Sequence, residues 1–189
     1  MSSRLGAWWA SVLLALPVLA AGMVSQTFDP LQTSASFKVG MRLPLRVEGR
    51  FESAQGELEG AAPGRMRVHV RLDGRALRMT GSDWMRRVTL SADFLDVQQH
   101  PEIHFDSAEF EPGLLVAGGP LRGRLQLRGQ AREVTFRLLP ATCARPGHDC
   151  AIEVRGELDR HDFGMNAHRF TVRDDISFEF SIRLAAALP

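Results

Sequence analysis

The sequence lacks any run of charge of a single sign. Its 23 basic and 22 acidic residues nearly cancel, and Lys38 is the only lysine. A nucleic-acid-binding protein would carry a basic stripe to neutralise phosphates, so the composition argues against that class. The 189 residues are enough for one domain with a sizeable core, and no repeat or linker indicates a second.

Cysteine is also scarce, since only Cys143 and Cys150 occur. A zinc site built on them with His148 would need further ligands, and no second Cys/His pair is present. Pro146-Gly147 is a turn signal, so the two thiols are expected to face each other across a loop. We predict a disulfide, with a metal site as the alternative; closing so short a ring would contribute about 2.5 kcal/mol.

Only the N-terminus contains a long apolar run. Arg4 precedes AWWASVLLALPVLAAG, and the end of this run offers residues suited to cleavage at Val18, Ala20 and Gly22. This pattern predicts a signal peptide over residues 1–22, with export of residues 23–189 as one domain. An uncleaved membrane anchor is the alternative, although Pro17 lies late in the run and no basic stop-transfer cluster follows.

Signatures of catalysis are missing. The sequence contains no P-loop, dinucleotide fingerprint, nucleophile elbow or CxxCH haem motif. His100 and His104 would lie about 13 Å apart in a strand, too far to share a metal. Adjacent strand residues point to opposite faces, which argues against His161-Asp162 as an acid–base pair. We therefore expect no enzyme, no metal and no catalytic cofactor.

The residues that are present follow a period of two. Apolar and polar side chains alternate, and Gly- and Pro-containing clusters separate the runs, as is typical of strands with one buried face. Eight such runs are predicted, at 36–41, 45–51, 66–72, 103–106, 121–128, 134–138, 152–158 and 176–184.

Eight consecutive one-sided strands must bury their apolar faces by stacking or by closing. Closure also removes sheet edges, so we predict an all-β fold, an eight-stranded antiparallel barrel, with a sandwich as the alternative. Gly49, Gly123 and Gly156 fall on inward faces. They either allow the strands to bend or leave room for a ligand.

Residues 81–101 break the period. Ser82 or Asp83 is a helix N-cap candidate, Met85, Val88 and Leu90 could share one face, and Pro101 ends the segment. We predict a short helical segment at one mouth of the barrel, which either plugs the core or caps a cavity.

An exported, near-neutral β-domain with an apolar interior is suited to holding an apolar molecule. Each buried methylene contributes about 0.8 kcal/mol, so a long chain needs few polar contacts. Alternatively, the eleven phenylalanines fill the barrel themselves, and the protein is a stress-response or interaction domain. An isomerase or hydrolase on the same scaffold is a third hypothesis.

Several stretches resemble the YceI family over nearly the whole mature chain: SFKV, VEGRFESAQGELE, SADFLDVQQHPEIHFDS, LRGRLQLRGQAREVTF, HDFGMNA and RDDISFEFSI. The matching residues are Gly49, Phe51, Ser91, Asp93, Phe94, Asp96, Val97, Pro101, Phe105, Ser107, Gly123, Leu125, Gly129, Val134, Asp162, Phe163 and Gly164. The block from Ser91 to Ser107 is the most specific part.

The resemblance implies a lipocalin-like barrel in the periplasm that holds a polyisoprenoid or similar long-chain amphiphile, such as a quinone-type lipid. It implies no catalysis and no metal. Delivery would involve contact with a membrane or membrane protein, and monomer and homodimer both remain open. The chain departs from the family at residues 33–36 and 40–41, and at Arg86, Val88-Thr89 and His100. The resemblance therefore implies the fold but does not identify the head group of the ligand.

The expected ligand-binding residues are the inward positions of the central strands and of the capping segment. They are Phe37, Val39, Val47, Phe51, Val68, Val70, Trp84, Leu90, Phe94, Phe105, Phe136, Phe163, Phe178 and Phe180.

Overall fold

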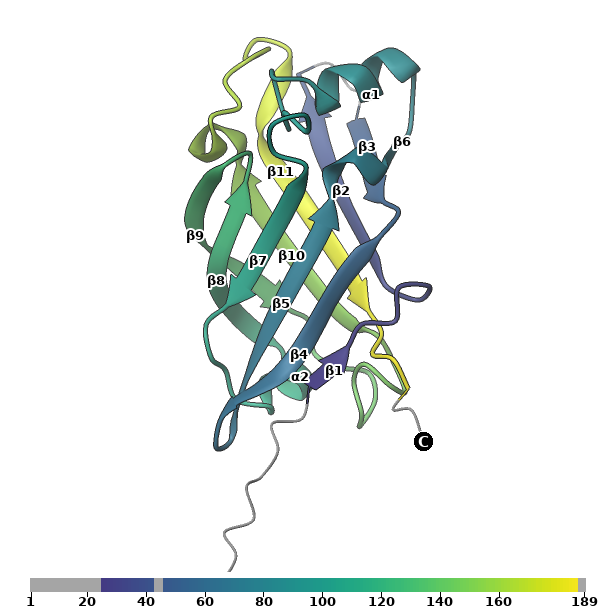
Figure 1. Cartoon of the computed structure of the whole chain (residues 1–189), viewed down its shortest axis with the longest axis vertical. Coiled ribbons are helices and arrows are strands. Elements are labelled where there is room, and N and C mark those ends of the chain that lie inside the picture. Colours follow the sequence, from purple (N-terminus) through teal and green to yellow (C-terminus); the bar gives the residue numbers. More distant parts are fainter. Residues whose placement is uncertain (1–24, 43–45, 187–189) are drawn as a thin grey trace, which may run out of the picture.

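The computed structural model describes residues 25–42 and 46–186, and the expected signal peptide, residues 1–22, lies outside them. One antiparallel sheet curls strongly upon itself (Figure 1) and encloses an apolar core. The all-β, antiparallel prediction is confirmed. Across the described ranges, every helix is too short or too polar to cross a membrane.

The sheet has eleven strands in the order β1-β4-β5-β7-β8-β9-β10-β11-β2-β3-β6. Their bounds are β1 Ser25–Thr27, β2 Ser34–Met41, β3 Arg46–Phe51, β4 Ala54–Ala62, β5 Arg65–Asp73, β6 Leu77–Met79, β7 Glu102–Ser107, β8 Gly119–Leu127, β9 Gln130–Leu138, β10 Ile152–Asp159 and β11 Val172–Ile182. Four short helices connect them: η1 Gly74–Ala76, α1 Asp83–Leu90, α2 Leu114–Ala117 and η2 Arg160–Phe163.

The predicted count of eight strands is not confirmed, because β1, β4 and β6 were not expected. β1 and β6 have three residues each, too few to show alternation. In β4, with the sequence AQGELEGAA, Leu58 is the only large apolar residue, so the period-two signal is absent although the strand pairs along its length with β5.

Chain connections, and not strand pairing, link the β4 and β5 side of the curled sheet to its β3 and β6 side. β3 leads into β4 through Glu52 and Ser53, and β5 leads through η1 into β6, which pairs with β3. The Glu52 amide donates to the Ala76 carbonyl at 3.0 Å, which ties these two connections together.

The inward glycines make room for phenylalanine rings. A Cβ built on Gly49 would lie 2.3 Å from a ring carbon of Phe37, and one on Gly123 would lie 2.6 Å from Phe105. At Gly156 the distance to Phe136 would be 2.0 Å. A ring therefore lies over each of these glycines, so the hypothesis that they leave space for a ligand is wrong at these three positions.

The disulfide prediction is confirmed, since Cys143 and Cys150 are bonded with their Cα atoms 6.0 Å apart. The enclosed loop is fastened to the end of β11. The Leu184 amide donates to the Gly147 carbonyl at 2.9 Å, and the Arg183 guanidinium donates to the His148 carbonyl at 2.5 Å.

Candidate functional site: an apolar cavity beneath α1

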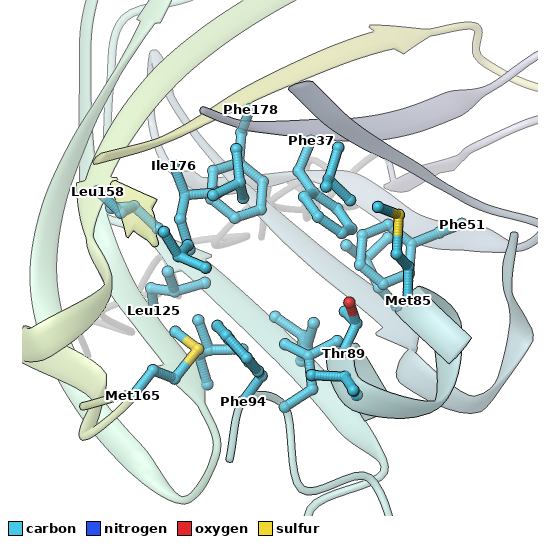
Figure 2. Close-up of a pocket in the computed structure, with 18 of the residues that line it drawn as sticks. Phe37, Phe51, Met85, Thr89, Phe94, Leu125, Leu158, Met165, Ile176 and Phe178 are labelled. Atoms are coloured by element: carbon cyan, nitrogen blue, oxygen red, sulfur yellow. The ribbon is translucent and has the colours of Figure 1, made fainter. Parts of the chain in front are cut away.

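The two halves of the barrel differ in how they are filled. In the half beneath α1, an apolar cavity of about 140 Å³ lies between the strands (Figure 2). Along β5 the cavity is lined by Val70 and Leu72, and along β10 by Leu158, all in the last part of the strand. The other half is closed by packed core residues, among them Phe28, Leu58, Leu138, Ile152 and Ile182.

Most of the predicted ligand-binding residues line this cavity. They are Phe37, Val39, Val47, Phe51, Val70, Trp84, Phe94, Phe105, Phe136, Phe178 and Phe180. Their role in binding stays a prediction, but the structure brings them to one place.

Val68, Leu90 and Phe163 are not among the cavity-lining residues. Val68 shares the inward face of β5 with Val70 but lies nearer the packed end, in the core. Leu90 ends α1 and packs against the core, and Phe163 is buried in η2 with 1% of its surface exposed. The prediction that Val68 points inward is thus right, but Val68 lies too far along β5 from the mouth to line the cavity.

A phenylalanine belt forms much of the wall. Ring centroids lie 5.0 Å apart for Phe105 and Phe136, and 5.9 Å apart for Phe136 and Phe180. Phe178 continues the belt to Phe37 at 6.2 Å. Tilted rings at these separations attract each other beyond their area burial, so the belt stabilises the wall.

Helix α1 covers one side of the mouth. Ser82 caps it by accepting a hydrogen bond from the Met85 amide at 3.4 Å, which confirms one of the two predicted N-caps. Met85, Val88 and Thr89 are three and four residues apart, so they share the face that lines the cavity. Figure 2 shows Met85 and Thr89 at its edge.

The helix is attached to β6 mainly through one arginine. The Arg86 Nε donates to the Leu77 carbonyl at 2.9 Å, and its Nη2 donates to the Arg75 carbonyl at 3.3 Å. No residue of α1 is buried. The helix therefore behaves as a cover with an apolar underside rather than as part of the core.

The loop after η2 covers another side of the mouth. His168 stacks on Phe94 with centroids 5.7 Å apart and planes 8° apart, and its Nε2 lies 3.5 Å from Asp93. Arg128 donates to the carbonyls of Gly164 and Ala92, so it also joins these two segments. These contacts hold the loop against residues 91–95.

Polar groups reach the cavity only at its mouth. Among the described lining residues, the polar side chains are Thr89, His168 and Thr171, while the rest are apolar. His168 and Thr171 are exposed, so the cavity opens to solvent beside them. Such a site suits a molecule with an apolar body and a polar end at the opening.

Just outside the mouth, His161 joins two oxygen acceptors. Its Nδ1 is hydrogen-bonded to Asn166 Oδ1 at 2.8 Å and its Nε2 to Asp174 Oδ1 at 2.9 Å. These hydrogen bonds, with Asn166 first, raise the pKa of His161, and the bond from His161 lowers the pKa of Asp174. The part of the chain that the structure describes has no cluster of three or more His, Cys, Asp or Glu residues suited to a metal.

Other lining residues were missed by the sequence reasoning. Leu72, Ile103, Leu125, Leu127, Leu158 and Ile176 lie on inward faces and carry a period-two signal that could have identified them. Met165, His168 and Thr171 come from an irregular loop, where no periodic pattern places a side chain.

The model of the YceI-like domain matches residues 26–184. The chain belongs to this family. The resemblance drawn from the motifs is therefore confirmed. No curated protein matches the sequence.

Solved structures share the fold of this YceI-like domain at low identity. Burkholderia cenocepacia BcnA superposes with a TM-score of 0.66 at 18% identity, covering 84% of this chain and 99% of BcnA. A polyisoprenoid-binding domain from Saccharophagus degradans, implicated in plant cell wall breakdown, has a TM-score of 0.65 at 11% identity, covering 85% and 98%. The Campylobacter jejuni YceI protein has a TM-score of 0.56 at 15% identity, covering 73% and 84%.

Proposed function

We propose that this YceI-like domain binds one long-chain amphiphilic lipid of the isoprenoid or quinone type and carries it in the periplasm after export. The observation that carries the proposal is the apolar cavity with its polar side chains confined to the mouth. An isoprenoid tail would lie against the phenylalanine belt, and its head group would lie near Thr89, His168 and Thr171. One of the solved relatives is a polyisoprenoid-binding domain, which supports the same ligand class.

The proposed role is binding without catalysis. A carrier must bury its ligand and later release it. Each methylene of the ligand that is buried contributes about 0.8 kcal/mol to the binding free energy. The disulfide is consistent with an oxidising compartment, where such bonds persist. The polar residues at the mouth would orient a head group rather than react with it.

The size of the cavity favours a second candidate function as well. About 140 Å³ is below the roughly 300–1,000 Å³ of pockets that enclose drug-sized ligands. A long lipid would therefore require the phenylalanine rings and α1 to move outward. If they do not, the domain is self-filled and acts through its surface as an interaction domain.

Mass spectrometry of the purified protein separates the two functions. The protein is isolated from its native periplasm and measured intact under native conditions, then again after solvent extraction. A stoichiometric isoprenoid or quinone that extraction removes supports the carrier. Protein that is empty as isolated, and stays empty when incubated with an isoprenoid alcohol, supports the self-filled domain.

Filling the cavity should abolish binding without unfolding the barrel. Val70 lines the cavity, and its neighbour Arg71 points outward from the same strand. We expect Val70→Trp to weaken binding of a fluorescent fatty acid at least about tenfold, because the indole would take up much of the available volume. Arg71→Trp is the matched control and should bind like the wild type. Equal affinities for both variants would contradict a ligand site in this cavity.

Loosening α1 should speed ligand release. Arg86 makes both hydrogen bonds from the helix to carbonyls of the β6 region, whereas Arg87 is exposed. Charge-assisted hydrogen bonds of this kind contribute about 1.5 kcal/mol, so Arg86→Ala should raise the dissociation rate of the dye about tenfold. Stopped-flow displacement measures the rate. Arg87→Ala should leave it unchanged, and an equal increase in both variants would exclude α1 as the cover.

A further inference from the structure

Exposed aromatic side chains gather at the mouth of the cavity. Among the described residues, the large apolar side chains that are exposed are Leu31 at 94%, Phe170 at 79%, Trp84 at 57% and Val116 at 48%. Trp84 lies in α1, and Phe170 lies between His168 and Thr171, which line the opening. Figure 1 places α1 and the loop that follows η2 at the same end of the barrel.

Arginines accompany both aromatics. The Arg169 guanidinium lies 5.0 Å from the centroid of the Phe170 ring, and Arg42 Nε donates to the Arg169 carbonyl at 3.3 Å. Arg87 is exposed one turn along α1 from Trp84. Within the described ranges, Arg42, Arg87 and Arg169 form no ion pair with a carboxylate.

Several carboxylates at this end are already paired. Asp174 lies 2.9 Å from His161 and 3.3 Å from Arg160, Asp175 lies 3.1 Å from Arg173, and Asp93 faces His168. Arg42, Arg87 and Arg169 are therefore available to meet an external anion. Trp84, Phe170, Arg42, Arg87 and Arg169 are referred to below as the mouth surface.

We propose that the mouth surface docks on an anionic lipid bilayer. Tryptophan and phenylalanine insert at the boundary between head groups and acyl chains, and arginines beside them contact anionic head groups. In this orientation the cavity opens directly onto the membrane. A lipid could then enter or leave without crossing water.

A bilayer fits this surface better than a folded protein partner. A stable protein interface buries about 800 Å² on each partner around a central apolar patch. Here, among the residues that the structure describes, the large apolar side chains exposed at the mouth are only two, Trp84 and Phe170, and they lie on separate segments. Two shallow anchors flanked by cations match a fluid anionic surface, to which each arginine contributes about fivefold in affinity.

Trp84 itself reports the docking. In the chain expected after processing, residues 23–189, Trp84 is the only tryptophan, since the others are Trp8 and Trp9, and the sequence has no tyrosine. This chain contains every described residue of the fold. It is titrated with vesicles of phosphatidylglycerol and phosphatidylethanolamine, and separately with vesicles of phosphatidylcholine alone. A blue shift of the emission that saturates on the anionic vesicles and weakens with salt is expected.

Variants identify the surface. Phe170→Ser should weaken vesicle binding about tenfold, and Arg42→Gln and Arg169→Gln about fivefold each, on anionic vesicles only. Leu31→Ser removes an apolar side chain that is even more exposed than Phe170. Leu31 precedes β2, at the end of that strand opposite Arg42, so this variant should bind like the wild type. Circular dichroism confirms that each exposed substitution leaves the fold intact.

Three results with vesicles made of lipid alone would overturn the docking proposal. They are the absence of any shift with either vesicle, equal binding to phosphatidylcholine alone, and equal losses for Leu31→Ser and Phe170→Ser. Binding only to vesicles reconstituted with native membrane proteins would also overturn it, in favour of a protein partner. The test needs no cavity ligand, so the lipid-extracted protein should dock as well, and a failed carrier hypothesis would leave this result unaffected.

Discussion

Replacing Arg160 by methionine should lower the free energy of unfolding by about 3–5 kcal/mol, because three backbone carbonyls would lose a charged donor and each unsatisfied buried group costs about 1–3 kcal/mol. Arg160 is fully buried, with 0% of its surface exposed. Its Nη1 donates to the carbonyls of Met165 at 2.5 Å and Ala167 at 2.7 Å, and its Nε to the Arg173 carbonyl at 3.0 Å. Methionine fills similar space but leaves these carbonyls without their donor.

Arg173→Met provides the matched control. Arg173 forms an exposed pair with Asp175 at 3.1 Å, and such pairs contribute up to about 1 kcal/mol. Urea unfolding followed by circular dichroism compares the two variants. Because Arg160 fixes the loop that carries His168, its loss should also accelerate dye release. Similar unfolding midpoints for both variants would show that Arg160 does not organise the loop.

The fold class followed from the alternation of side chains, because a strand with one buried face repeats every two residues. The same signal fails where inward positions are small, as in β4, with Ala54, Gly56 and Gly60. Helix α1 was predicted because its N-cap and the apolar spacing of Met85 and Val88 are local features. Local sequence patterns thus predicted the strands that have large inward side chains and the helix that has an N-cap.

The sequence predicted which strand side chains point into the interior, but not how far along the strand the cavity extends. Val68 and Val70 carry the same pattern, yet only Val70 lines the cavity. Their difference depends on strand register and on where the packed core ends, which are properties of the whole barrel. The loop that carries Met165 and His168 is fixed by hydrogen bonds from Arg160 and Arg128, residues distant from one another in the sequence. No periodic pattern encodes such a contact.

Replacing Gly156 by valine should destabilise the domain by about 3 kcal/mol, the upper part of the range for overpacking a core. A Cβ at this position would lie 2.0 Å from Cδ1 and 2.4 Å from Cε1 of Phe136. That ring cannot yield freely, because it is packed between Phe105 at 5.0 Å and Phe180 at 5.9 Å. Since Phe136 also lines the cavity, the displaced ring should reduce dye affinity as well.

Two further variants show whether the clash with Phe136 is the cause. At Gly113 no atom lies within 4 Å of an added Cβ, so Gly113→Ala should change neither stability nor binding by a measurable amount. Adding Phe136→Leu to Gly156→Val should recover much of the lost stability, because the two substitutions meet at one contact and are not additive. Unfolding free energies from urea titrations complete the double-mutant cycle. Strictly additive losses would mean that Gly156 is needed for backbone curvature instead of for the ring that lies over it.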